Sequence, residues 1–178
     1  DLPLLAETSG KNAIIVTPNA DLDLAARDIA ASAFGHAGQK CSAASLVILV
    51  GSVAKSARFR NQLLDSVASM RVGLPQDPLT VMGPLIEAPG EKLLRGLTRL
   101  ESGEHWVLEP RPLNAERTLW SPGIRGGVIT GSDFHQTEFF GPVLGIMSAD
   151  RLDKAIDLAN GTAFGLTSGL YSLDPVEM

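Results

Sequence analysis

The sequence has a single cysteine, few aromatic residues and no cluster of basic residues. Its 178 residues include one Cys, and Phe, Trp and Tyr together make up 5%. One cysteine cannot form an intramolecular disulfide, which is typical of proteins kept in the reducing cytoplasm. The net charge of −5 argues against a nucleic-acid partner, because such binding depends on neutralising phosphates. We therefore expect a cytoplasmic protein that does not bind nucleic acid.

Long hydrophobic runs are also absent. The longest run, residues 46–50 (LVILV), is far shorter than the ~20 apolar residues that a membrane helix needs. No basic segment followed by an apolar one opens the chain, so no signal peptide is visible. We expect no membrane span. The chain opens on Asp1 and stops at Met178 within a pattern, and we interpret both ends as cut.

Short apolar runs alternate with segments of helical periodicity along the chain. We expect strands, in chain order, at residues 13–16, 46–50, 106–108, 143–147 and 167–171. We expect helices, in chain order, at residues 22–34, 53–67, 91–100 and 152–159. Strands that alternate with helices predict an α/β fold with three αβα layers and a mainly parallel sheet.

The boundaries of these elements follow from turn and capping residues. Asn19 or Asp21 is expected to cap the first helix, and Ser52 the second. Residues 109–127, rich in Pro, Gly and Arg, are expected to cross the molecule as irregular chain.

Cys41 is the first candidate for chemistry. It follows Gly38-Gln39-Lys40 and precedes small residues, which would let a substrate approach the sulfur. A helix broken by glycines can also expose backbone N–H groups toward an oxyanion. A lone cysteine is nevertheless an inert core residue in about two cases in three. Spacing alone leaves both interpretations open.

Two carboxylates are further candidates. Glu7 lies in AETSGKN just before a predicted strand and could act as a general base, although a solvated surface glutamate is the more common outcome. Glu138 precedes Phe139-Phe140-Gly141-Pro142 and could bind sugar hydroxyls while a ring packs on a flat heterocycle. Core phenylalanines at the entry to a strand explain that segment equally well.

The three histidines do not form a site. His36, His105 and His135 are interpreted as surface or loop residues, because none has a partner at metal-ligand spacing. His36 lies near Cys41 in sequence, but the partners of a catalytic cysteine usually meet through the fold.

Taken together, these segments resemble the aldehyde dehydrogenase family. Residues 6–13 look like its glutamate signature and residues 34–43 like its cysteine signature, with the family's usual 34-residue interval between Glu7 and Cys41. Three further segments follow in the family's order: residues 82–86 (MGPLI), 138–143 (EFFGPV) and 159–166 (ANGTAFGL). Five motifs in order, over essentially the whole chain, favour a catalytic Cys41.

One branch of the family is particularly similar. Residues 7–12, 38–43 and 89–94 resemble glutamate-semialdehyde (1-pyrroline-5-carboxylate) dehydrogenases, including the dehydrogenase half of bifunctional proline utilisation A proteins. The resemblance implies oxidation of L-glutamate 5-semialdehyde to L-glutamate in proline catabolism. It also implies that Ser42 holds the substrate carboxylate.

The resemblance implies a covalent mechanism. Cys41 attacks the aldehyde to form a thiohemiacetal, hydride passes to NAD (or NADP), and Glu7 activates the water that hydrolyses the thioester. Glu138 would bond the nicotinamide ribose, and Phe140 would pack near the nicotinamide ring. The covalent step divides one difficult oxidation into two easier ones.

The resemblance also implies that the chain is part of a longer enzyme. We interpret residues 1–178 as a partial catalytic domain without its N-terminal NAD-binding domain and C-terminal tail. The implied partners are a small aldehyde substrate, the missing NAD-binding domain, an upstream flavin-dependent proline dehydrogenase domain and further copies in a homo-oligomer. Ser9 stands where most of the family has glycine. The isolated chain is expected to bind NAD weakly and to be inactive.

Two other functions fit part of the sequence. A cysteine-dependent acyl hydrolase or acyltransferase would use Cys41 and Glu7 without redox chemistry, but it has no use for a nicotinamide site at Glu138 and Phe140. A non-catalytic assembly domain would keep the fold and would require neither Glu7 nor Cys41. The sequence therefore favours the dehydrogenase.

Overall fold

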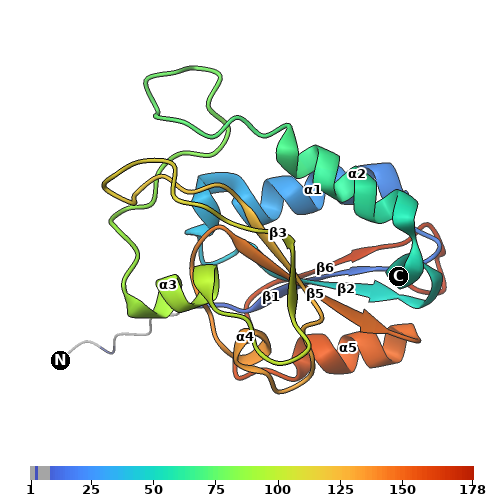
Figure 1. The fold of residues 1–178 in the computed structure, drawn as a ribbon. Coiled ribbons are helices and arrows are strands. Elements are labelled where there is room, and N and C mark those ends of the chain that lie inside the picture. The colour runs from blue at the N-terminus through green and yellow to red at the C-terminus, as the bar shows by residue number, and fades with distance from the viewer. Residues whose placement is uncertain (1–2, 4–8) are drawn as a thin grey trace.

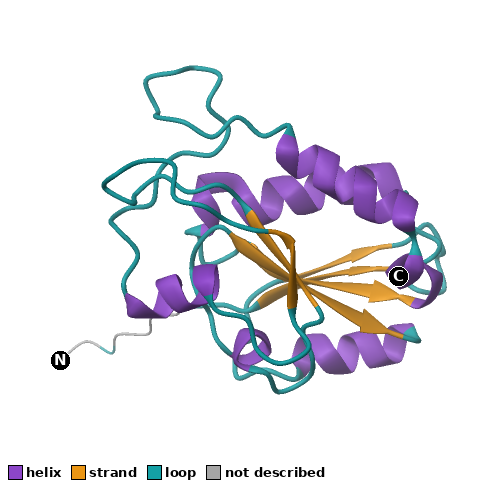
Figure 2. Cartoon of the chain, in the orientation of Figure 1, coloured by secondary structure: helices purple, strands orange, loops and turns teal. Residues whose placement is uncertain are grey.

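The computed structural model describes residue 3 and residues 9–178. In this part of the chain, the strands form one sheet in the order β3-β4-β5-β2-β1-β6, with helices on both of its faces (Figures 1 and 2). The strands are β1 (Asn12–Val16), β2 (Ala44–Val50), β3 (His105–Leu108), β4 (Gly123–Gly126), β5 (Val143–Ala149) and β6 (Ser168–Tyr171). The β3–β4 pair is antiparallel and the other pairs are parallel, so the predicted αβα fold is confirmed.

The helices cover the sheet unevenly. They are α1 (Leu22–Phe34), α2 (Ala57–Ala68), α3 (Glu91–Thr98), α4 (Asp133–Gln136) and α5 (Leu152–Asn160), with short 3₁₀ segments at η1 (Gly35–Gly38) and η2 (Gly51–Lys55). Figure 1 shows α1 and α2 side by side on one face, with α4 and α5 on the opposite face. Every expected helix is present: α1 has the expected bounds, and α2, α3 and α5 differ from the prediction at one or both ends.

The central strands are apolar because both of their faces are covered. All five residues of β1 are buried, and in β2 one residue of seven, Ser45, is only half-buried. The unbroken runs that predicted parallel strands are therefore confirmed. The buried side of α1 is mostly alanine, and these small side chains let the helix lie close to the sheet. Its buried residues are Ala25, Ala26, Ile29, Ala30, Ala33 and Phe34.

The helix caps confirm one expectation and correct another. The Asp21 carboxylate accepts from the backbone N–H groups of Asp23 and Leu24 at 3.1 and 3.0 Å, so Asp21 caps α1. Ser52 does not cap α2. Residues 51–55 form the 3₁₀ turn η2 first, and Ser56 then accepts from the N–H of Phe59 at 3.1 Å.

The segment expected to be irregular, residues 109–127, contains the buried strand β4. Its Arg125 is 2% exposed, pairs with Glu104 at 2.7 Å and donates to the carbonyls of Gly96 and Arg99. An arginine between glycines has no local strand pattern. This strand depends on its partners β3 and β5 rather than on intrinsic propensity, which is why the sequence did not predict it.

His135 is also placed differently from the prediction. It lies in α4 and is fully buried, whereas His36 and His105 are exposed as expected. The N–H of Gly131 donates to His135 Nδ1 at 3.0 Å, and His135 Nε2 lies 2.9 Å from the carbonyl of Leu158. With both ring nitrogens bonded inside the protein, His135 connects α4 to α5 and has a structural role.

None of the helices at residues 9–178 is long and apolar enough to cross a membrane. In the same part of the chain, no group of His, Cys, Asp or Glu side chains is arranged to hold a metal ion.

The central position of β2 makes its core residues sensitive to truncation. Ile48 is 0% exposed, and we expect Ile48→Ala to lower the free energy of unfolding by about 2–5 kcal/mol, because it leaves a cavity in a close-packed core. Urea unfolding of the chain measures this. Leu24→Ala is the control, because this side chain on α1 is 39% exposed, and it should lower the free energy of unfolding far less. Equal losses in the two variants would contradict the burial of β2.

Candidate active site

Cys41 lies in a tight turn between η1 and β2. The N–H of Ala43 donates to the carbonyl of Lys40 at 3.0 Å, so Cys41 and Ser42 occupy the two central positions of the turn. Both residues are exposed. Among the described residues, the N–H of Cys41 finds no acceptor. Cys41 is therefore not an inert core residue here, and its backbone N–H is not used within the described fold.

The backbone before Cys41 is held in a sparsely populated conformation. His36, Ala37 and Gly38 have successive φ values of 53°, 54° and 68°, in the left-handed region that side chains usually disfavour. A Cβ added at Gly38 would lie 2.3 Å from the carbonyl oxygen of Gly141. Only glycine allows this approach, which brings the cysteine segment against residues 138–143. Such strain persists where the surrounding packing enforces it.

The side chain of Asn12 fixes the Cys41 turn to the sheet. Its amide group donates to the carbonyls of Cys41 and Ala43 at 2.7 and 2.8 Å. Its carbonyl oxygen accepts from the N–H of Thr167 at 3.2 Å. Asn12 is 4% exposed, so these bonds form away from water, where an unmade bond would be costly. One side chain at the start of β1 thus joins the turn to the segment that precedes β6.

Gly10 contacts both Glu138 and the Cys41 turn. The N–H of Gly10 donates to Glu138 Oε1 at 2.9 Å. A Cβ at Gly10 would lie 2.6 Å from the carbonyl oxygen of Cys41, so the glycine packs directly on the turn. The second carboxylate oxygen of Glu138 bonds to none of the described residues, which leaves it available to a ligand.

The predicted site residues lie on two sides of the turn. Glu138 and Phe140, both half-buried, line a small hollow of about 10 Å³, and Phe140 has a left-handed φ of 57°. Ser42 lines a separate hollow of about 510 Å³ that also contains Asn12 and Tyr171. Glu7 lies outside the described residues. The segment of residues 82–86 joins the site as well, because the N–H of Ile86 donates to Gln39 Oε1 at 2.9 Å.

Three residues of the site were not singled out from the sequence, namely Gly10, Lys11 and Asn12. All three stand inside the glutamate signature, and their place there was the one available signal. Lys11 is 4% exposed, and its Nζ has no hydrogen-bond partner among the described residues. Burial, and then the charge of Arg125, lower the pKa of Lys11 from its ordinary 10.5 to about 7.

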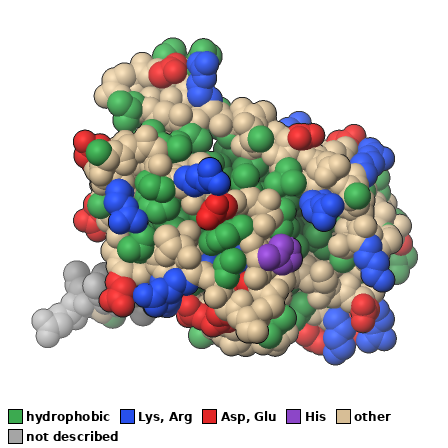
Figure 3. Space-filling view, in the orientation of Figure 1, with side chains coloured by type: hydrophobic (Ala, Val, Ile, Leu, Met, Phe, Trp, Pro, Cys, Tyr) green, Lys and Arg blue, Asp and Glu red, His purple; other side chains and the backbone are tan. Residues whose placement is uncertain are grey.

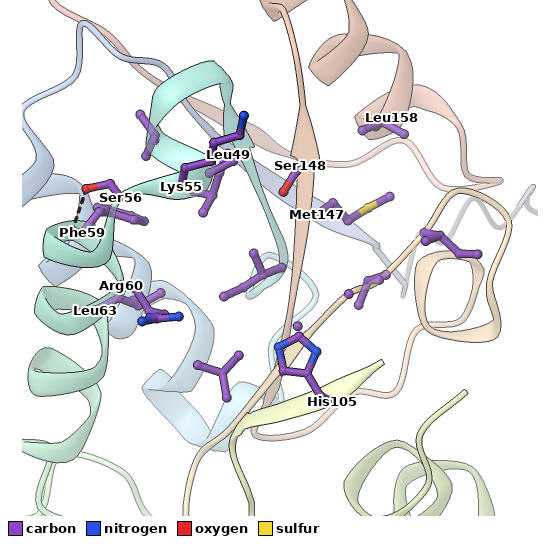
Figure 4. A pocket seen from close by; sticks show the side chains of 18 of the residues that line it. Leu49, Lys55, Ser56, Phe59, Arg60, Leu63, His105, Met147, Ser148 and Leu158 are labelled. Atoms are coloured by element: carbon purple, nitrogen blue, oxygen red, sulfur yellow. Dashed lines mark hydrogen bonds between the residues drawn. The ribbon is translucent and has the colours of Figure 1, made fainter. Parts of the chain in front are cut away.

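A larger hollow, of about 570 Å³, lies away from Cys41 (Figure 4). It is lined by Leu49 and Met147 near the carboxyl ends of β2 and β5 and by Phe59 of α2, whereas Cys41 precedes the amino end of β2. Apolar side chains also gather over the middle of the face seen in Figure 3. No cysteine, aspartate or glutamate lines this hollow, so volume does not identify the chemical site.

An exposed thiol, an available carboxylate oxygen and an α/β fold are compatible with the aldehyde dehydrogenase class of proteins. The sequence model of the aldehyde dehydrogenase family matches residues 2–178, and the chain belongs to this family. It is similar to the 1-pyrroline-5-carboxylate dehydrogenase of Geobacillus sp. (strain WCH70), with 34% identity over 170 residues, which are 95% of this chain and 33% of that relative.

Solved structures show the same likeness. Proline utilisation A (PutA) from Corynebacterium freiburgense is 62% identical with a TM-score of 0.93, over 96% of this chain and 18% of that one. A 1-pyrroline-5-carboxylate dehydrogenase from Thermus with bound NAD is 35% identical with a TM-score of 0.84, over 96% of this chain and 33% of that one. The chain thus spans about a third of the length of the curated relatives that it matches.

The close approach at Gly38 predicts a difference between two glycines of one motif. We expect Gly38→Ala to lower the midpoint of thermal unfolding and to change the rate at which a small thiol reagent modifies Cys41, since the new Cβ collides with Gly141. The free energy of unfolding is expected to fall by about 1–3 kcal/mol in Gly38→Ala. Gly35→Ala is the matched control, because no atom lies within 4 Å of a Cβ there. If Gly35→Ala lowers the midpoint of thermal unfolding as much as Gly38→Ala does, the packing of Gly38 against Gly141 is not the cause of the loss.

The Asn12 bonds predict a second effect. Asn12→Asp keeps the size of the side chain but replaces the amide nitrogen, which donates to the carbonyls of Cys41 and Ala43, with an oxygen that cannot donate to them. We expect a loss of at least about 2 kcal/mol in the free energy of unfolding, and faster backbone hydrogen exchange at residues 40–43. Asn61→Asp, on the exposed side of α2, is the control. Unaltered exchange at the turn in Asn12→Asp would refute the role of the amide.

Proposed function

We propose that this chain is a partial catalytic domain of an NAD-dependent aldehyde dehydrogenase that oxidises L-glutamate 5-semialdehyde to L-glutamate in proline catabolism. The observation that carries the proposal is the meeting of the exposed Cys41 turn with Gly10 and Glu138, residues of three motifs far apart in the sequence. The names of the relatives, which are 1-pyrroline-5-carboxylate dehydrogenases and proline utilisation A, support the substrate and the pathway.

Cys41 would be the nucleophile. Its thiolate attacks the aldehyde carbon, a C–S bond forms, and the electron pair of the carbonyl moves onto oxygen to give a thiohemiacetal anion. The N–H of Cys41, which has no acceptor among the described residues, would donate to that oxyanion. An asparagine from a part of the protein outside this chain would supply the second donor.

Glu138 and Phe140 would hold the nicotinamide riboside. One oxygen of Glu138 accepts from the N–H of Gly10, and the other is available to accept from a ribose hydroxyl of the cofactor. Phe140 stands two residues further on in the same hollow and would pack near the ring. When bound, NAD supplies the acceptor of the hydride, with NADP as the alternative.

Glu7 and Ser42 would complete the reaction. Glu7 takes a proton from water, whose oxygen then attacks the thioester carbon and releases the Cys41 thiolate and the carboxylate product. The family's glutamate signature supports this role. Ser42 would bond the far carboxylate of the substrate, and the hollow of about 510 Å³ beside it supports this assignment.

We further propose that the rest of the protein contains an N-terminal NAD-binding domain and a C-terminal tail, with a flavin-dependent proline dehydrogenase domain upstream. The whole protein would act in the cytoplasm as a homo-oligomer. Residues 1–178 alone would be inactive, because the oxyanion asparagine and most of the dinucleotide site would come from the missing parts. NAD-dependent oxidation by the isolated chain would refute this.

NADH production by the longer protein tests the proposed reaction. We expect glutamate semialdehyde to be oxidised faster than acetaldehyde or succinate semialdehyde, because Ser42 recognises a carboxylate at one end of the substrate. We expect Cys41→Ala to reduce the rate by at least about a thousandfold, since it removes the nucleophile.

Two matched measurements separate the alternatives. The exposed Ser52→Ala, at the carboxyl end of β2, is the control for Cys41→Ala and should keep the wild-type rate. Equal rates with the three aldehydes would exclude the substrate assignment. Full activity in Cys41→Ala would exclude the mechanism, and release of acid from a thioester with no NADH produced from any of the aldehydes would favour an acyl hydrolase.

A further inference from the structure

Lys11 is a buried cation without a hydrogen-bonded partner, directly behind the proposed cofactor-binding side of the site. It stands between Gly10, which holds Glu138, and Asn12, which holds the Cys41 turn. Its Nζ lies 4.1 Å from the ring centroid of Phe134 and 5.6 Å from that of Phe139. These two rings stack with their centroids 5.1 Å apart. Because the face of an aromatic ring attracts a cation, the two rings stabilise the charged Nζ by cation–π interaction, without an ion pair.

The charged groups around Lys11 are nearly all matched to each other. Arg125 of β4 pairs with Glu104 at 2.7 Å, and both side chains are almost fully buried. Asp133 of α4 accepts from Arg95 of α3 at 2.8 Å and from Thr137 at 2.8 Å. Each of these carboxylates therefore has a hydrogen-bonded partner of its own.

Glu138 is the exception. Among the described residues it accepts the Gly10 N–H and forms no ion pair. Its charge is the strongest influence that favours the charged form of Lys11, ahead of Asp133 and Glu104, whereas burial and Arg125 favour the neutral form. Lys11 and Glu138 are thus a cation and a carboxylate that form no ion pair among the described residues, and both line the same small hollow of about 10 Å³.

We propose that Lys11 is a positioning residue for Glu138: its buried positive charge holds the Glu138 carboxylate at Gly10, with the second oxygen turned to the ribose of the nicotinamide cofactor. This inference rests on the proposed function, in which Glu138 binds that ribose. Lys11 itself touches neither substrate nor cofactor. Its charge also offsets that of Glu138 where an anionic dinucleotide binds, and in a buried site such an effect is little screened by salt.

The charge on Lys11 makes the proposal dependent on pH. With its pKa lowered to about 7, Lys11 is charged in mildly acid solution and loses its proton as the pH rises through neutrality. The charged groups that face Lys11 are Arg125, Glu138, Asp133 and Glu104. Support for Glu138 should therefore be strongest below pH 7 and weakest near pH 8.5.

The test is NAD affinity of the longer protein, measured by titration without aldehyde at pH 6.5 and 8.5. We expect Lys11→Met to raise the Kd for NAD about fivefold at pH 6.5, while kcat at saturating NAD stays within about twofold. The wild-type Kd should rise toward that of Lys11→Met at pH 8.5, and the variant should show no such rise. Lys92→Met, an exposed lysine of α3, is the control and should behave as the wild type.

A double-mutant cycle separates positioning from a merely structural role. If Lys11 acts through Glu138, then Lys11→Met has no further effect on Kd in a Glu138→Gln background. An equal loss in both backgrounds, or no loss in either, overturns the proposal. Should Glu138→Gln by itself leave the Kd unchanged, the assignment of Glu138 under the proposed function fails instead.

Lys11→Arg keeps the inference testable if Lys11→Met does not fold. Arginine stays charged across the whole range, so this variant should retain at pH 8.5 the affinity that the wild type has at pH 6.5. A Lys11→Arg protein that loses affinity between pH 6.5 and 8.5 as the wild type does would also overturn the proposal.

Discussion

The site depends on the carboxamide of Asn12, which uses both of its ends at once. The nitrogen donates to two carbonyls of the Cys41 turn, and the oxygen accepts from Thr167, so a single planar group sets the distance between the turn and the start of β6. Only an amide offers donors and an acceptor in this arrangement. These bonds hold the turn that carries the exposed thiol, which follows the left-handed backbone of residues 36–38.

The second constraint is close backbone contact at two glycines. Gly10 meets the carbonyl of Cys41, and Gly38 meets the carbonyl of Gly141, at distances that no Cβ would permit. These contacts bring three loops together without intervening side chains. The hollow that remains between them, of about 10 Å³, is lined by Glu138 and Phe140, while the thiol is exposed on the turn beside it.

Two buried cations beside the same ring show how differently this fold treats charge. Arg125 lies 4.4 Å from the centroid of Phe134 and Lys11 lies 4.1 Å from it. Arg125 is matched by Glu104 and two backbone carbonyls, as expected of a structural ion pair within a sheet. Lys11 has no such partner, and a buried charge without one is costly. An unmatched group of this kind at a cofactor side is a sign of a functional requirement.

The sequence predicted the elements whose structure depends on the local pattern of apolar residues and glycines. The apolar runs of β1, β2 and β5, the helices between them and the exposed Cys41 after two glycines all follow from periodicity, glycine positions and a family resemblance. It did not predict β4, because Arg125 is buried through a partner 21 residues away rather than through its neighbours. Nor did it predict the meeting of Gly10, Asn12 and Cys41, since contacts across loops leave no periodic trace. The buried His135 was missed for the same reason: its partners lie in other elements.

The bond between Asn12 and Thr167 joins residues 155 positions apart. β1, which begins at Asn12, lies between β2 and β6, so its outer edge stays unpaired until the last strand of the described chain has been made. During synthesis, the Cys41 turn therefore leaves the ribosome well before Thr167 does, and it acquires its fixed shape only after residues near position 167 follow. The Cys41 turn thus becomes ordered only when nearly the whole of this sheet can close around it.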